Sequence, residues 1–203
     1  AICNLDCRYC YFLKKEQLYP ESNFRMTDQT LEQFTRQFIS AQAVPEATFA
    51  WQGGEPTLMG LKFFKKALRY QQIYRPADKV IHNVLQTNGT FLTDSWCQFF
   101  KEHNFLIGVS LDGPEKMHNT YRVDKGNRGT FYQVMKAIEL LKKHQVEFNI
   151  LSTVHATNAL HPLEVYRFLR DEVEAQYLQF IPIVERQNKS GYQEGFQVTK
   201  RSV

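Results

Sequence analysis

Apolar residues recur along the 203-residue chain with helical and strand spacings in alternation. In the first pattern Leu31, Phe34 and Phe38 share one face of a helix that Thr27 can cap. Further helical patterns cover residues 61–75, 93–100, 131–141 and 160–169. Strands are expected at 47–51, 80–85, 106–111, 148–154 and 177–181, residues 112–129 are predicted to form a polar loop, and the pattern is lost from residue 184.

This alternation favours an α/β fold in which parallel strands are joined by helical crossovers. Sheets of this kind place ligand sites at the carboxyl ends of their strands. The unusual segments follow those ends, with Gly53-Gly54, residues 86–89 and residues 110–113 each coming directly after an expected strand. A cysteine-rich loop precedes the first helix. We therefore expect these four segments to converge on one site.

Hydrophobic residues make up 43% of the chain, which is enough for a sizeable core. No apolar run approaches the roughly 20 residues that span a membrane, and no leader of the signal-peptide type is visible, so we expect a cytoplasmic protein without a membrane partner. The net charge of +4 is spread along the chain and does not favour a nucleic-acid partner. The chain opens at Ala1 inside a motif, so we interpret it as a piece of a longer protein.

Three of the four cysteines, Cys3, Cys7 and Cys10, lie within eight residues. Pairs this local make poor disulfides, so the spacing favours metal ligation in a reducing compartment. Three thiolates on one loop can hold three irons of a 4Fe–4S cube and leave the fourth iron open. A zinc site is the alternative, but it needs a fourth ligand, and the next histidine is His82. Cys97, alone on an amphipathic helix, is predicted to be a buried free cysteine.

The C-x3-C-x2-C spacing, with Tyr9 before the last cysteine, resembles the signature of radical S-adenosylmethionine (SAM) enzymes. In that family the open iron of the cluster chelates the amino and carboxylate groups of SAM. The resemblance implies a partial (β/α)6 barrel of the TIM type with parallel strands, truncated at both ends. Residues 1–203 would then be an incomplete radical SAM core domain, without the C-terminal SPASM-like domain that carries auxiliary clusters.

The resemblance also assigns roles to single residues. Those implied to contact SAM are Tyr9, Gly53, Gly54, Glu55, Ser110, Arg122 and Val184, and those implied to lie near the substrate are Gln52, Gln86 and Asn88. Ser110 would bind the ribose, and Arg122 would pair with the SAM carboxylate, for which a guanidinium fork is suited. Taken alone, each segment also has an ordinary interpretation as a turn, a cap or a surface arginine.

Longer stretches are similar to the anaerobic sulfatase-maturating enzymes, namely WQGGEPTL, LQTNGT, SLDGP, VEFNIL and YLQFI. This similarity implies oxidation of a Cys or Ser side chain in a sulfatase polypeptide to formylglycine through a 5′-deoxyadenosyl radical. It also implies an electron donor such as ferredoxin or flavodoxin. The family's general base is expected beyond Val203, so no base is named within this chain.

Two other interpretations stay open at this point. One is another peptide-modifying radical enzyme, which would form a thioether or carbon–carbon crosslink. The other is a non-catalytic iron–sulfur or zinc module, although such a module has no need of the nucleoside-binding set Gly53-Gly54, Ser110 and Arg122. Three other histidines, His144, His155 and His161, show no metal-ligand spacing and are expected at surface or loop positions.

Overall fold

The computed structural model describes residues 2–10, 12 and 18–183. Its strands form one five-stranded sheet in the order β1-β2-β3-β4-β5, and every neighbouring pair is parallel. The strands are β1 (Glu46–Trp51), β2 (Val80–Thr87), β3 (Phe105–Ser110), β4 (Phe148–Val154) and β5 (Leu178–Pro182). The α-helices are α1 (Asp28–Ala41), α2 (Leu61–Tyr74), α3 (Asp94–Glu102), α4 (Glu115–Tyr121), α5 (Phe131–Lys143) and α6 (Pro162–Arg167), together with a short 3-10 helix, η2 (Pro56–Met59), and a short π-helix, η3 (Phe168–Glu172).

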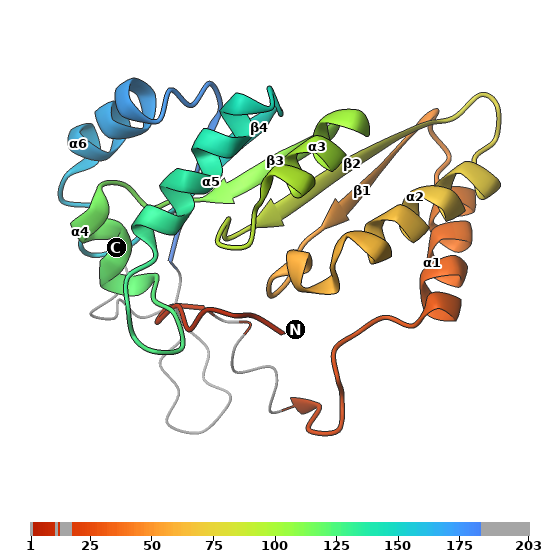
Figure 1. The fold of residues 1–203 in the computed structure, drawn as a ribbon, viewed down its shortest axis with the longest axis horizontal. Helices are drawn as coiled ribbons and strands as arrows, with labels where there is room; N and C mark the ends of the chain where they lie inside the picture. Colours follow the sequence, from red (N-terminus) through yellow and green to blue (C-terminus); the bar gives the residue numbers. More distant parts are fainter. Residues whose placement is uncertain (1, 11, 13–17, 184–203) are drawn as a thin grey trace.

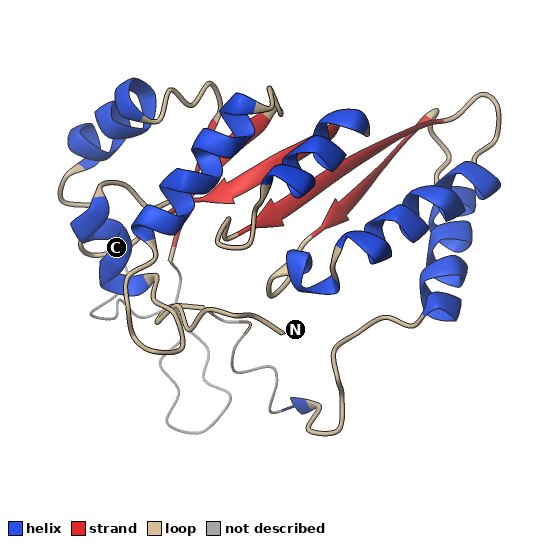
Figure 2. Cartoon of the chain, viewed as in Figure 1, coloured by secondary structure: helices blue, strands red, loops and turns tan. Residues whose placement is uncertain are grey.

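The helices cover one face of the curled sheet, and in Figures 1 and 2 helices α2, α3 and α5 lie in front of the strands. Side chains alternate along each strand, so Phe49, Leu85 and Ile107 point toward the helices and are buried. Thr48 and His82 point the other way and are exposed. A five-stranded half-barrel therefore results, with its core between sheet and helices, and the expected partial α/β barrel is confirmed.

Two local expectations need correction. Residues 112–129 were predicted as a loop, but they contain helix α4, whose seven residues are too short to produce a recognisable apolar period. Thr93 precedes α3 as expected, yet its side chain makes no cap hydrogen bond. Thr27 does cap α1, because its side chain accepts a hydrogen bond from the Thr30 backbone N–H at 3.1 Å.

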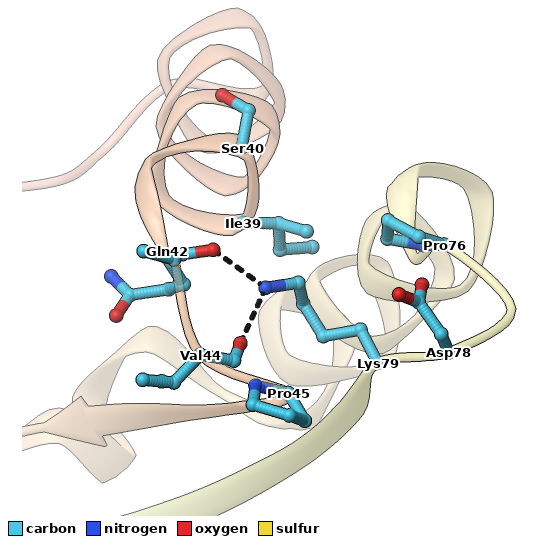
Figure 3. Close-up of a pocket in the computed structure, with 9 residues that line it drawn as sticks. Ile39, Ser40, Gln42, Val44, Pro45, Pro76, Asp78 and Lys79 are labelled. Atoms are coloured by element: carbon cyan, nitrogen blue, oxygen red, sulfur yellow. Dashed lines mark hydrogen bonds between the residues drawn. The ribbon is translucent and has the colours of Figure 1, made fainter.

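The amino ends of the first two strands border a surface pocket, which is shown in Figure 3. There the Lys79 ammonium donates to the backbone carbonyls of Gln42 and Val44 at 2.7 and 2.8 Å. The pocket lies at the opposite end of the strands from the cysteine loop, where parallel barrels carry stability rather than chemistry. Among the described helices, none has the length and apolar character required to cross a bilayer.

Candidate active site

The cysteine loop lies across the carboxyl ends of the strands, below the arrowheads in Figure 1, and is held there by main-chain hydrogen bonds. The Glu55 N–H donates to the Ile2 carbonyl at 2.9 Å, which attaches the loop to the end of β1. The Asp6 and Arg8 N–H groups donate to the carbonyls of Val123 and Tyr121, both at 2.9 Å. The expected convergence of the cysteine loop with separate strand ends is therefore present.

Gly54 makes this docking possible. Its φ of +62° lies in the left-handed region, and a Cβ at this position would stand 2.1 Å from the Ile2 carbonyl oxygen. That neighbour is backbone, so it cannot swing aside as a flexible side chain would. Gly53 has a φ of +113° but meets only the Phe12 ring at 3.6 Å. Of the two glycines, Gly54 is the one that close approach requires.

The side chain of Glu55 points into the protein, and the SAM contact predicted for this residue, whose motif faces the ligand with its backbone, remains a prediction. It is 2% exposed, and its Oε1 accepts from the Thr57 N–H, the Thr57 hydroxyl and the Thr87 hydroxyl at 3.0, 2.7 and 2.8 Å. Its Oε2 accepts from the Asn88 N–H at 2.8 Å. Burial raises the pKa of Glu55, and these donors oppose that rise by favouring the carboxylate. Glu55 therefore braces the ends of β1 and β2 against each other.

Asn88, which was predicted to lie near the substrate, contacts the cysteine loop. Its Nδ2 donates to Asn4 Oδ1 at 2.9 Å and lies 3.8 Å from the Cys3 sulfur. Asn4 in turn donates to the Thr90 hydroxyl at 2.8 Å. A pair of asparagines thus fastens the loop to the end of β2, and a substrate contact by Asn88 remains a prediction.

The three thiols share one electrostatic environment. Burial, with smaller contributions from the neighbouring Cys10 and Cys3, raises the pKa of Cys7 to about 12, although Arg122 opposes the shift. Burial also raises the pKa of Cys3. Thiols in such a setting become thiolates when a cation binds them, so the donor set fits a soft metal centre.

Within the described residues no three His, Cys, Asp or Glu side chains are grouped tightly enough to hold a single metal ion. A 4Fe–4S cube offers each thiolate a separate iron, so its ligands are spaced more widely than those of one ion. Three thiols on a single docked loop fit the cube on these grounds.

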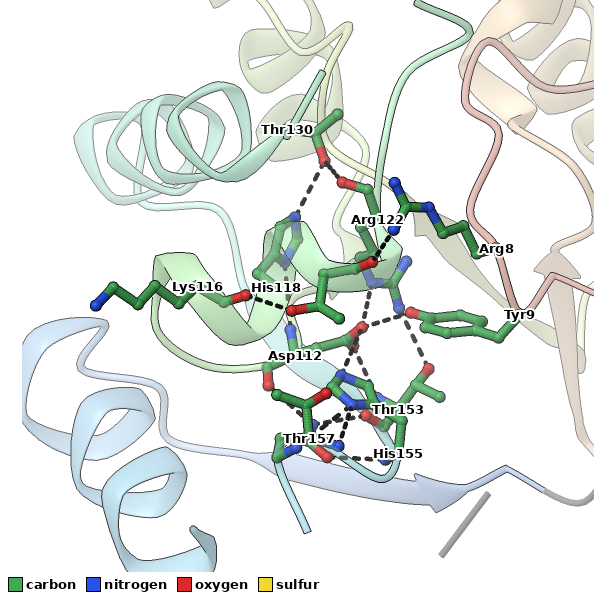
Figure 4. Close-up of polar contacts among 12 residues, drawn as sticks. Arg8, Tyr9, Asp112, Lys116, His118, Arg122, Thr130, Thr153, His155 and Thr157 are labelled. Atoms are coloured by element: carbon green, nitrogen blue, oxygen red, sulfur yellow. Dashed lines mark hydrogen bonds and ion pairs between the residues drawn. The ribbon is translucent and has the colours of Figure 1, made fainter. Parts of the chain in front are cut away.

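Beside the cysteine loop lies a buried ion pair, shown in Figure 4. Asp112 Oδ2 accepts from Arg122 Nε at 2.9 Å and from the Tyr9 hydroxyl at 2.5 Å, while its Oδ1 accepts from the Thr153 N–H at 2.9 Å. Burial opposes ionisation of Asp112, but Arg122 and its hydrogen-bond donors hold the pKa of this carboxyl below its usual value. Arg122 is thus buried and anchored, rather than lying on the surface.

Ser110 and Gln86 meet on the concave face. Gln86 Nε2 donates to the Ser110 hydroxyl at 3.1 Å, so that hydroxyl retains its own hydrogen for a ligand. Gln86 pairs in register with Gly108, where a Cβ would stand 2.0 Å from Gln86 Oε1. Gly108 therefore leaves the space that the Gln86 side chain occupies.

The remaining predicted positions within the described residues lie at strand ends, helix ends or in the core. Gln52 lies exposed just beyond β1, and Val184 falls outside the described residues. Cys97 is fully buried in the core, as predicted, and burial raises its pKa to about 11. His144 and His161 lie at helix ends, as the loop or surface expectation allows.

His155 lies in a loop, as predicted, but its side chain is 0% exposed and packs on Tyr121. Asp112 and Asn4 were not assigned roles from sequence. The only available signal for Asp112 was its place in the SLDGP stretch at a strand end.

Comparison with known proteins agrees with this geometry. The sequence model of the radical SAM superfamily matches residues 1–169. A serine-type anaerobic sulfatase-maturating enzyme of Bacteroides thetaiotaomicron is 47% identical over 92% of this chain and 45% of its own length. A cysteine-type enzyme of Clostridium perfringens is 39% identical over 94% of this chain and 52% of its own length.

Among solved structures, native anSMEcpe with bound AdoMet and Cp18Cys peptide aligns with a TM-score of 0.83 and 38% identity, covering 94% of this chain and 51% of that one. The chain therefore spans about half the length of the relatives that it matches.

Proposed function

The chain belongs to the radical SAM superfamily, and from that premise we propose that it is the core portion of an anaerobic sulfatase-maturating enzyme. The whole protein would oxidise a Cys or Ser side chain of a sulfatase polypeptide to formylglycine. The observation that carries this proposal is the cysteine loop, docked by Gly54 and Glu55 onto the carboxyl ends of the strands. The similarity to named sulfatase-maturating enzymes over nearly the whole chain supports the choice of substrate.

In this proposal Cys3, Cys7 and Cys10 hold three irons of a 4Fe–4S cluster. When bound, the cluster and SAM supply an electron and a 5′-deoxyadenosyl radical that removes a Cβ hydrogen from the target side chain. The target side chain would then lose a further electron, to an iron–sulfur acceptor such as the auxiliary clusters that the resemblance implies, and a proton. This would leave an aldehyde from Ser, or a thioaldehyde from Cys that water converts to the aldehyde with release of hydrogen sulfide. The reducing cytoplasm suits this chemistry, with ferredoxin or flavodoxin as the class of donor.

The chain's own residues bind and orient SAM. The Ser110 hydroxyl, which accepts from Gln86, can donate its hydrogen to a ribose oxygen. Arg122 uses Nε on Asp112 and Nη2 on Thr153 at 3.3 Å, and its remaining N–H groups would face the SAM carboxylate. Further SAM contacts are proposed at Gly53, Gly54, Tyr9 and Val184.

The substrate is proposed to lie over Gln52, Gln86 and Asn88. These residues occupy the carboxyl ends of β1 and β2 beside the proposed SAM site, where a near-attack geometry between radical and Cβ can be held. Within the described chain no general base is proposed.

The experiment uses the full-length protein, reconstituted anaerobically with iron and sulfide and reduced with dithionite. Incubation with SAM is followed by chromatography for 5′-deoxyadenosine, and incubation with a sulfatase-derived peptide is followed by mass spectrometry for the aldehyde. Cys7→Ala should abolish both products, whereas Cys97→Ala, a matched loss of a buried thiol, should retain them. Formation of 5′-deoxyadenosine without peptide oxidation would contradict the sulfatase assignment and leave the radical chemistry standing. Absence of both products with a loaded cluster would contradict both.

A further inference from the structure

The Asp112 carboxylate joins three parts of the fold that are distant in sequence. It receives Tyr9 from the cysteine loop, Arg122 from the end of α4 and the Thr153 N–H from β4. Asp112 itself lies two residues after the end of β3, and its side chain is 0% exposed. The residues that share this carboxylate are drawn together in Figure 4. We propose that Asp112 is a positioning residue that sets the place of the cysteine loop and of Arg122 relative to β3 and β4.

The link to the cysteine loop runs through Tyr9. This residue lies between Cys7 and Cys10, and its hydroxyl reaches Asp112 from 103 positions away in sequence. The Arg122 guanidinium lies 5.4 Å from the centre of the Tyr9 ring, so the ring is held by its face as well as by its hydroxyl. Movement of Asp112 would therefore move Tyr9 and Arg122 together.

His155 completes the enclosure of this carboxylate. Its Nδ1 accepts from the backbone N–H groups of Thr157 and Asn158 at 3.3 and 3.4 Å, which places its proton on Nε2. That Nε2 is buried without a hydrogen-bond partner and stands 4.0 Å from Asp112 Oδ2. The imidazole N–H thus lies near a carboxylate that already accepts hydrogen bonds from Tyr9 and Arg122.

A buried ion pair alone is weak evidence for any role beyond the fold. Here the pair has an electrostatic consequence, because Arg122 is a cation adjacent to the cysteine loop and Asp112 neutralises it. Removing the Asp112 charge while keeping its shape would leave Arg122 uncompensated. A nearby positive charge favours the reduced, more negative state of an iron–sulfur cluster, so the reduction potential would rise.

The inference rests on the proposed function, since it requires a cluster on Cys3, Cys7 and Cys10. The test compares Asp112→Asn and Tyr9→Phe with wild type in the reconstituted full-length protein. Tyr132→Phe is the matched control for Tyr9, because its hydroxyl also donates to a carboxylate, Glu115, at 2.7 Å, but at an exposed position. Asp94→Asn is the control for loss of a carboxylate that pairs with a cation at the surface.

Two readouts separate positioning from simple stability. The first is the rate of iron release to a chelator, which Tyr9→Phe should raise about tenfold, the equivalent of one hydrogen bond to a charged group. The second is the reduction potential, measured by titration with electron paramagnetic resonance. We expect Asp112→Asn to shift it positively and Tyr9→Phe to leave it near the wild-type value.

Wild-type values for both readouts in both variants would overturn the proposal. If Asp112→Asn does not fold, the test rests on Tyr9→Phe. The proposal would then be overturned if Tyr9→Phe released iron no faster than Tyr132→Phe. A wild-type protein that takes up no cluster would refute the proposed function, and the positioning role with it. That outcome is recognised by the absence of the cluster spectrum before any variant is compared.

Discussion

The carbonyl oxygen of Ile2 lies 2.1 Å from the position that a Cβ would take on Gly54. The next residue, Glu55, donates its N–H to that same carbonyl at 2.9 Å. The Ile2 carbonyl therefore leaves no room for a side chain at residue 54, and it also accepts the hydrogen bond that docks the cysteine loop.

We predict that Gly54→Ala displaces the cysteine loop and removes most of the iron taken up on reconstitution. Gly60→Ala is the matched control, since Gly60 also has a positive φ, +77°, but a Cβ there would meet nothing within 4 Å. Both substitutions should carry backbone strain of about 1–3 kcal/mol. Iron content per chain separates them, and equal iron content in the two variants would contradict the prediction.

A second prediction concerns Gly108 and Gln86. Gly108→Ala should force the Gln86 carboxamide away, break its hydrogen bond to Ser110 and weaken SAM binding by about tenfold. In the Gln86→Ala background the same substitution should have a much smaller further effect, because the nearest clashing atoms are gone and only Asn149 Oδ1 remains close, at 3.1 Å. Equilibrium SAM binding to the loaded protein measures both, and additive losses would show that the two residues act independently.

Glu55→Gln should lower the free energy of unfolding by about 1–3 kcal/mol, because an amide replaces one of the acceptor oxygens in a buried network. Glu32→Gln, which alters a carboxylate that accepts from the Tyr74 hydroxyl at 2.6 Å, is the control. Urea unfolding of the metal-free protein gives both values. A change no larger than that of Glu32→Gln would refute the bracing role of Glu55.

His118 should make stability depend on pH. Burial lowers its pKa to about 3, below the usual value of 6.5, so the unfolded chain binds this proton first as pH falls. Its contribution to stability is complete above pH 6.5 and decreases as pH falls toward 3, by at most about 1.4 kcal/mol per pH unit.

Replacing His118 with Asn should reduce this slope, as measured by urea unfolding of the metal-free protein at several pH values. An unchanged slope in His118→Asn would mean that His118 does not titrate between these limits.

The order of helices and strands could be predicted from the sequence because hydrophobic periodicity is a property of neighbouring residues. The cysteine motif and the glycines after β1 could also be predicted, because each is defined by a few neighbouring positions in the sequence. Helix α4 could not be predicted, since it is shorter than two full apolar periods.

Only the tertiary structure decided which way the polar side chains of the site face. The side chains of Glu55 and Asn88 both have partners inside the protein, which the sequence did not predict, while their contacts with SAM and substrate remain predictions. Asp112, whose carboxylate accepts hydrogen bonds from Tyr9, Arg122 and Thr153, had no assigned role, and the burial of His155 within its loop was not predicted. The reason is physical: a polar group turns inward when donors and acceptors meet it there, and the fold brings those partners together from far along the chain.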